Sequence, residues 1–237
     1  MRLTVAILAV LQALSCTAAI SSELSPDLRG LIEHFQAHRR VAVGYLRTHN
    51  GDLGAVEIER LRDGLITDSG RIAPAALADL PLAIALARAE ALIAGALKAI
   101  DRGDIERSRA LLEESGKPID AWREANGIRL FSDCIAEITA AYEPLDRHRL
   151  KPPDLTDAAI GRRIVVAANG VMAVLDRCER EASAAMREEP EFRRLFDGMR
   201  GSLGQMPGAV TARDGALLYR LLGEQRSFEQ LLSFRFG

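Results

Sequence analysis

Apolar residues recur at steps of three and four along the chain from Leu28 onward. This spacing places them on one face of an α-helix, whereas the two faces of a strand would need a period of two. The expected fold class is therefore all-α: an antiparallel bundle of about eight amphipathic helices built from helical hairpins. The expected apolar stripes cover 28–45, 53–65, 82–100, 105–122, 131–145, 160–185, 192–203 and 217–232.

One stretch, 163–170, admits a second interpretation. Its apolar run ends in Asn169 and Gly170, so it could be a buried strand that enters a turn, which would make the fold α/β. A helix is favoured, because the spacing of three and four continues through Asn169 and Gly170. No other apolar run resembles a parallel strand.

A short repeat marks two of the expected turns. Gly-Asp-Leu at 51–53 returns as Gly-Asp-Ile at 103–105, in each case between two amphipathic segments. Aspartate side chains cap helix N-termini well, so Asp52 and Asp104 are predicted N-caps. The repeat indicates a duplicated helical hairpin.

Prolines indicate further boundaries. Pro118 is expected to kink or briefly break its helix, Pro190 to force a restart and Pro207 to end the seventh helix. The linker at 151–154 contains two prolines, and the pair Thr156 and Asp157 after it is predicted to begin the longest helix.

The residues at 1–19 have the order of a secretory signal peptide. A positively charged start precedes a mostly apolar run at 3–14 and small residues at 17–19. The apolar run is too short to span a bilayer, and the small residues after it predict cleavage after Ala18 or Ala19. Residues 20–237 are then expected to form a single helical domain, and a subdivision near 151–154 is left open.

Export predicts a periplasmic or secreted protein. Cys16 offers a lipoprotein alternative, in which the mature chain is acylated at that residue, although Ala13 stands where a lipobox usually holds leucine. No membrane span is expected after signal cleavage, because Arg88 and Glu90 interrupt the richest apolar stretch.

Composition excludes several classes of protein. The 237 residues include 31 basic and 33 acidic side chains, and 48% of the chain is hydrophobic. This balance argues against a disordered chain and against a nucleic-acid binder. The basic clusters at 38–40 and 147–151 are flanked by acidic residues and are predicted to be solvated helix faces or, for the second, a positively charged helix C-terminus that complements the helix dipole.

The cysteines predict a disulfide. If Cys16 leaves with the signal peptide, Cys134 and Cys178 are the only two that remain. Each lies on the apolar stripe of one of two neighbouring helices, and export would place both in an oxidising compartment. We therefore expect a Cys134–Cys178 bridge.

Two histidines are the candidate metal ligands. His34 and His38 are four positions apart on a predicted helix, so both rings can reach one ion. His148 could supply a third ligand. Phe35 stands where metalloproteases of the zincin type need a glutamate, so the pair does not predict that chemistry.

No motif predicts an enzyme or a cofactor. The chain has no glycine-rich phosphate loop, no nucleophile elbow and no haem-attachment pair of cysteines. The favoured hypothesis is an exported binding or interaction module whose ligand is an unknown protein partner or a small molecule. The alternative is a metal or redox carrier that uses His34, His38 and His148.

Overall fold

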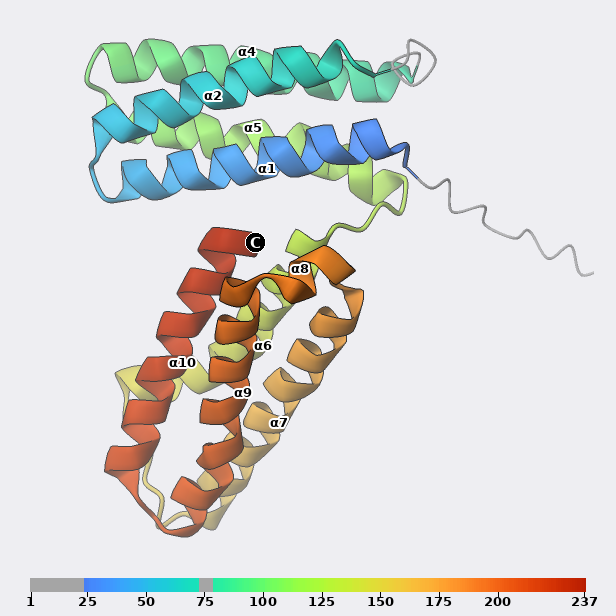
Figure 1. Cartoon of the computed structure of the whole chain (residues 1–237). Helices are drawn as coiled ribbons and strands as arrows, with labels where there is room; N and C mark the ends of the chain where they lie inside the picture. Colours follow the sequence, from blue (N-terminus) through green and yellow to red (C-terminus); the bar gives the residue numbers. More distant parts are fainter. Residues whose placement is uncertain (1–23, 73–78) are drawn as a thin grey trace, which may run out of the picture.

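The structure is a computed structural model that describes residues 24–72 and 79–237, and its helices form two groups (Figure 1). The first group contains α1 (Pro26–Arg47), α2 (Gly51–Ser69), α4 (Leu80–Asp101) and α5 (Ile105–Ala125). The second contains α6 (Phe131–Leu150), α7 (Ala158–Glu181), the short α8 (Ala184–Glu188), α9 (Pro190–Thr211) and α10 (Gly215–Phe236). The described ranges contain no strand, so the all-α prediction is confirmed. The segment 163–170 is helical and lies inside α7, which removes the α/β alternative.

Each group of helices is a bundle with its own hydrophobic core, and the two cores share no residue. Figure 1 shows the helices of the first bundle running across those of the second, with the end of α10 near α1. The chain crosses between the bundles at 126–130. The linker at 151–154 instead lies within the second bundle, because it joins α6 to α7 and these two helices pack against each other.

The same turn motif ends α1, α4 and α9. A residue with left-handed backbone follows each helix: these are His49, Gly103 and Arg213, with φ of 57°, 76° and 56°. The next residue donates its backbone N–H to the carbonyl five positions back and accepts, through its side chain, the N–H three positions ahead. These capping residues are Asn50, Asp104 and Asp214. One residue thus closes the last turn of one helix and the first turn of the next.

The motif corrects one prediction from the sequence. Asp104 caps α5 as predicted, but Asp52 does not cap α2. Asn50 does so, because the left-handed residue before it is His49 and the helix has already begun when the chain reaches Asp52. The structural counterpart of Gly103-Asp104 is therefore His49-Asn50, and the Gly-Asp repeat does not mark equivalent positions.

The prolines act differently from one another. Pro190 begins α9, and Asp157 caps α7, the longest described helix, both as predicted. Pro118 and Pro207 lie inside α5 and α9, which continue past them, so the break expected at Pro207 is wrong. Buried residues lie on both sides of each proline, and their packing offsets the cost of an interior proline, about 3 kcal/mol. These residues are Ser115, Ile119, Met206 and Ala209.

Two helices are long and apolar enough, by length and composition alone, to cross a membrane: α4 and α7. In the structure each is one of four long helices around a core, where Ile93 of α4 and Leu175 of α7 are fully buried. Arg88 and Glu90 are exposed on α4. The absence of a span after signal cleavage stays a prediction, and the expected signal peptide at 1–19, with Cys16, lies outside the described residues.

Candidate binding cleft between the two bundles

A cleft of about 800 Å³, lined mainly by charged and polar residues, lies where the two bundles meet. Its walls come from α1 and α5 of the first bundle and from α6 and α10 of the second. The volume is within the range of small-molecule sites in proteins. Four side chains on these walls, Arg39, Arg40, Arg123 and Glu229, define its geometry.

Arg123 fixes the passage from one bundle to the other. Its side chain is only 7% exposed, and it donates to both carboxylate oxygens of Asp133 at 2.9 and 3.0 Å. It also donates to Asp120, at 3.1 Å. Asp133 lies in the first turn of α6 and accepts the backbone N–H of Leu130 at 2.8 Å. These bonds hold the end of α5 against the start of α6.

Arg40 joins α1 to the end of α10. Its Nε donates to the carbonyl oxygen of Phe234 at 2.9 Å, and its Nη2 donates to that of Arg235 at 3.1 Å. The last carbonyls of a helix carry partial negative charge, so a guanidinium is favoured there. Burial, and then the neighbouring charge of Arg39, lower the pKa of Arg40 to about 10, so the group stays charged at neutral pH.

Arg39 lies between α1 and α5. Its Nε and Nη2 donate to Oε1 of Gln36 at 3.2 and 2.6 Å. A Cβ atom at Gly116 would lie 2.7 Å from the guanidinium carbon of Arg39, so the absence of a side chain at residue 116 lets the guanidinium lie against α5 in this position. Burial lowers the pKa of Arg39, although the charges of Asp120 and Glu113 oppose that shift.

The opposite wall is held by Glu229. Its side chain is buried and accepts hydrogen bonds from Thr139 at 2.7 Å, Ser233 at 3.1 Å and Arg226 at 3.0 Å. Thr139 is on α6 and the other three residues are on α10. The carboxylate is therefore well partnered and holds the two helices together.

The cleft is lined by equal numbers of positive and negative side chains, but not all of them form ion pairs. Five arginines face five carboxylates: Arg39, Arg40, Arg47, Arg123 and Arg226 against Glu113, Asp120, Glu124, Asp133 and Glu229. Four of these carboxylates form ion pairs with Arg47, Arg123 or Arg226. Arg39 and Arg40, by contrast, donate to neutral oxygens.

The sequence did not single out these arginines. The basic cluster at 38–40 was expected on a solvated face, but Arg39 and Arg40 are half-buried in the cleft. The only signal in the sequence is that lining positions recur along α1 at 36, 39–40, 43–44 and 47. These positions form a second face of the helix, and a search for apolar stripes does not detect it.

The candidate metal ligands bind carboxylates of α2. Nδ1 of His34 lies 3.0 Å from Oδ2 of Asp68, and Nδ1 of His38 lies 3.0 Å from Oε2 of Glu57. The two rings are 5.1 Å apart, but His148 is on α6 in the other bundle. In the described ranges, no three side chains of the histidine, cysteine, aspartate or glutamate type come together as metal ligands.

The pairing of His38 also corrects the expected face of α2. Leu53 and Val56, expected on the apolar stripe, are 44% and 43% exposed, whereas Glu57 and Ile58 are buried. The helix turns Glu57 inward, where it binds His38 and Arg60.

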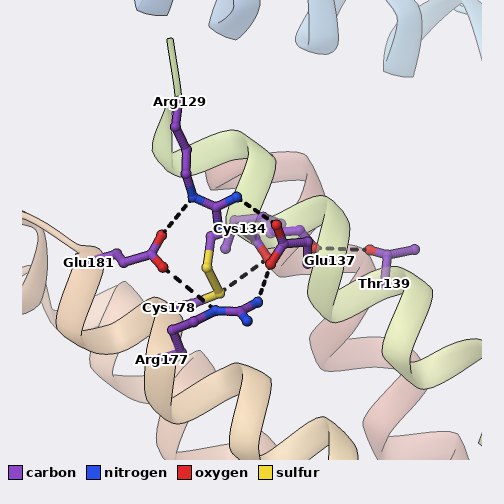
Figure 2. The surroundings of a disulfide bond; sticks show 8 residues. Arg129, Cys134, Glu137, Thr139, Arg177, Cys178 and Glu181 are labelled. Atoms are coloured by element: carbon purple, nitrogen blue, oxygen red, sulfur yellow. Dashed lines mark hydrogen bonds and ion pairs between the residues drawn. A yellow bond between two sulfur atoms is a disulfide. The ribbon is translucent and has the colours of Figure 1, made fainter. Parts of the chain in front are cut away.

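The structure brings Cys134 and Cys178 together as a disulfide (Figure 2), with their Cα atoms 5.6 Å apart. The bridge connects α6 to α7, and both cysteines are fully buried. It lies inside the second bundle, so it is a structural element rather than part of the cleft.

A ring of ion pairs lies beside the disulfide (Figure 2). Arg129 pairs with Glu137 at 2.6 Å and with Glu181 at 3.1 Å. Arg177 pairs with the same two glutamates. Two cations and two anions therefore alternate, and they tie the segment before α6 to α7.

Comparison with known protein families, with curated proteins and with solved structures finds no match for this chain. The functional argument therefore rests on the chemistry of the cleft.

Proposed function

We propose that the protein is a binding module whose ligand occupies the cleft between the two bundles. The observation that carries this proposal is the pair Arg39 and Arg40, two half-buried cations on one wall that form no ion pair with a carboxylate of the described ranges. Burying charge without an opposite charge costs free energy. A wall that holds two half-buried cations of this kind is suited to binding a ligand.

The lining chemistry supports binding over catalysis. The side chains are guanidinium, carboxylate, amide and hydroxyl groups, and the lining residues include neither histidine nor cysteine. A general base beside an activated nucleophile is the usual arrangement in covalent catalysis. His34 and His38 of α1 instead bind carboxylates of α2.

A blocking variant tests the proposal. Ser132 lines the cleft on the first turn of α6, and Ala136 is exposed one turn later, outside the cleft. A library of metabolites is screened by thermal shift against the unmodified protein, and each hit is retested on Ser132→Trp and Ala136→Trp. We expect hits that are lost on Ser132→Trp and kept on Ala136→Trp. Hits that are insensitive to Ser132→Trp would place binding elsewhere and contradict the proposal.

Export is part of the same proposal. The order of charge, apolar run and small residues at 1–19 supports it, and so does the pairing of Cys134 with Cys178, because disulfides persist in oxidising compartments. Cell fractionation with N-terminal sequencing is the test. We expect extracytoplasmic protein that begins near residue 20, and soluble cytosolic protein that retains residues 1–15 would refute export.

A further inference from the structure

We infer that the ligand of the cleft is a small molecule with at least one carboxylate or phosphate group, which Arg39 and Arg40 bind together. This inference rests on the proposed function, because it assigns a ligand class to the same cleft.

Unused hydrogen-bond donors are the first argument. A guanidinium offers five N–H donors. Arg39 uses Nε and Nη2 on Gln36, and Arg40 uses Nε and Nη2 on the end of α10. Nη1 of each has no hydrogen-bond partner among the side chains and carbonyls of the described chain, yet neither atom is sealed from solvent. Both therefore remain available to an acceptor in the cleft.

The placement of charge is the second argument. Arg39 and Arg40 are adjacent in the chain and half-buried, and the charge of Arg39 disfavours that of Arg40. An oxyanion between them would relieve this repulsion and accept charge-assisted hydrogen bonds from both. The carboxylates nearest Arg39 do not serve this role, since Asp120 pairs with Arg123 and Glu113 pairs with Arg47.

The size and polarity of the cleft point to a small polar ligand. A volume of about 800 Å³ bounded by four helices suits a molecule of metabolite size better than an extended chain. Most of the lining residues are charged or polar, and Val43 and Phe234 are the larger apolar members. A ligand with several hydrogen-bonding groups would therefore find partners on all four helices.

The test is calorimetric titration at low ionic strength. Citrate supplies carboxylates, inorganic phosphate supplies a phosphate, and hexaglutamate represents an acidic peptide. The proteins are the unmodified chain, Arg39→Gln, Arg40→Gln and the control Arg29→Gln, which removes an arginine from the same helix outside the cleft. Circular dichroism first establishes that each variant is folded.

We expect citrate or phosphate to bind the unmodified protein, and the stronger of the two identifies the anion type. Removing either cleft arginine should weaken binding by about tenfold or more, as expected for the loss of a charge-assisted hydrogen bond. Arg29→Gln should leave the affinity within about twofold, because Arg29 is exposed and its one ion-pair partner in the described part of the chain is Glu33. If a glutamine variant fails to fold, the lysine variant at that position replaces it, with a smaller loss expected because the charge is kept.

Three results would overturn the inference. Anion binding that is unchanged in both cleft variants would place the anion elsewhere. Hexaglutamate binding tenfold tighter than both small anions would make the ligand a peptide. Failure of all three anions, with a neutral hit from the screen that Ser132→Trp abolishes, would reject the ligand class and leave the binding function standing. Absence of any hit sensitive to Ser132→Trp would instead reject the function itself.

Discussion

The indole Nε1 of Trp122 lies 3.0 Å from Oδ2 of Asp79. The other oxygen of this carboxylate accepts the backbone N–H of Leu82 at 3.4 Å and caps α4. One side chain therefore begins α4 and binds it to α5. Trp122 is the only tryptophan of the chain, so its fluorescence reports on the first bundle alone.

Replacing Asp79 should destabilise the first bundle. Asp79→Ala removes both the cap and the partner of the indole, and we expect the free energy of unfolding to fall by about 1–3 kcal/mol. Asp79→Asn should cost less, because its single amide oxygen can keep one of the two hydrogen bonds, although its NH2 group cannot accept the other. Urea unfolding followed by tryptophan fluorescence measures both changes.

Asp63→Ala is the matched control, since Asp63 is exposed and pairs with its neighbour Arg62. Its effect should stay within about 0.5 kcal/mol. Equal losses for Asp79→Asn and Asp79→Ala would show that these hydrogen bonds are not the source of the stability.

The shared turn motif predicts that substitution lowers stability at Gly103 but that glycine raises it at His49 and Arg213. Gly103→Ala should lower the free energy of unfolding by about 1 kcal/mol, because alanine is strained at a φ of 76°. His49→Gly and Arg213→Gly should raise it by up to about 1 kcal/mol, because glycine adopts left-handed backbone without strain. Denaturant unfolding of each variant measures the sign.

Gly204→Ala is the control for the glycine prediction. Gly204 is exposed within α9, and a Cβ atom there would have no neighbour within 4 Å among the described residues. Alanine should therefore stabilise the helix by about 0.5–1 kcal/mol. A loss of stability at 204 as large as that at 103 would refute the argument from backbone conformation.

Reduction of the disulfide should destabilise the second bundle selectively. The bridge joins residues separated by 44 positions, and the loss of its constraint on the unfolded chain costs about 4 kcal/mol by the loop-entropy relation. We expect dithiothreitol to lower the melting temperature seen by circular dichroism. The transition seen by Trp122 fluorescence should move less, because Trp122 lies in the other core. Two free thiols in unfolded, unreduced protein purified from the periplasm would contradict the bridge.

Acidic pH should weaken the contact between Arg123 and Asp133 that joins the two bundles. Burial alone would raise the pKa of the Asp133 carboxyl, but the hydrogen bonds from Arg123 and the Leu130 N–H outweigh it, so this pKa lies below its usual range. A depressed carboxyl pKa adds stability above the unfolded value of about 3.9, and this stability is lost as the pH falls through the lower folded value. Asp133→Asn should flatten the loss of unfolding free energy below pH 4, as measured by urea unfolding at several pH values. An unchanged acid profile would mean that other carboxylates control it.

Local features of this fold could be predicted from the sequence, because they depend on neighbouring residues. The apolar stripes marked the helices, and Asp104 and Asp157 marked two of their starts. Asn50 was missed because its capping role depends on the left-handed backbone of His49. The residue type at position 49 did not indicate that conformation. Pro207 was misread because buried contacts on both sides of it are tertiary.

The cleft could not be predicted, because it depends on how two separate bundles meet. Arg39 and Arg40 belong to a polar face of α1 that resembles any solvated face. What makes them different is Gly116 beneath Arg39 and the end of α10 beside Arg40, each far away in the sequence. Long-range packing of this kind leaves no periodic signal.

The bond from Arg40 to Phe234 spans 194 positions of the chain. Each bundle is built from helices that follow one another in sequence, whereas this contact closes almost the full length of the described chain. Contacts of such separation carry the largest loop-closure entropy. The cleft needs both bundles, because α1 and α5 supply one side of it and α6 and α10 the other. Ligand binding would therefore stabilise only those molecules in which both bundles are folded and joined.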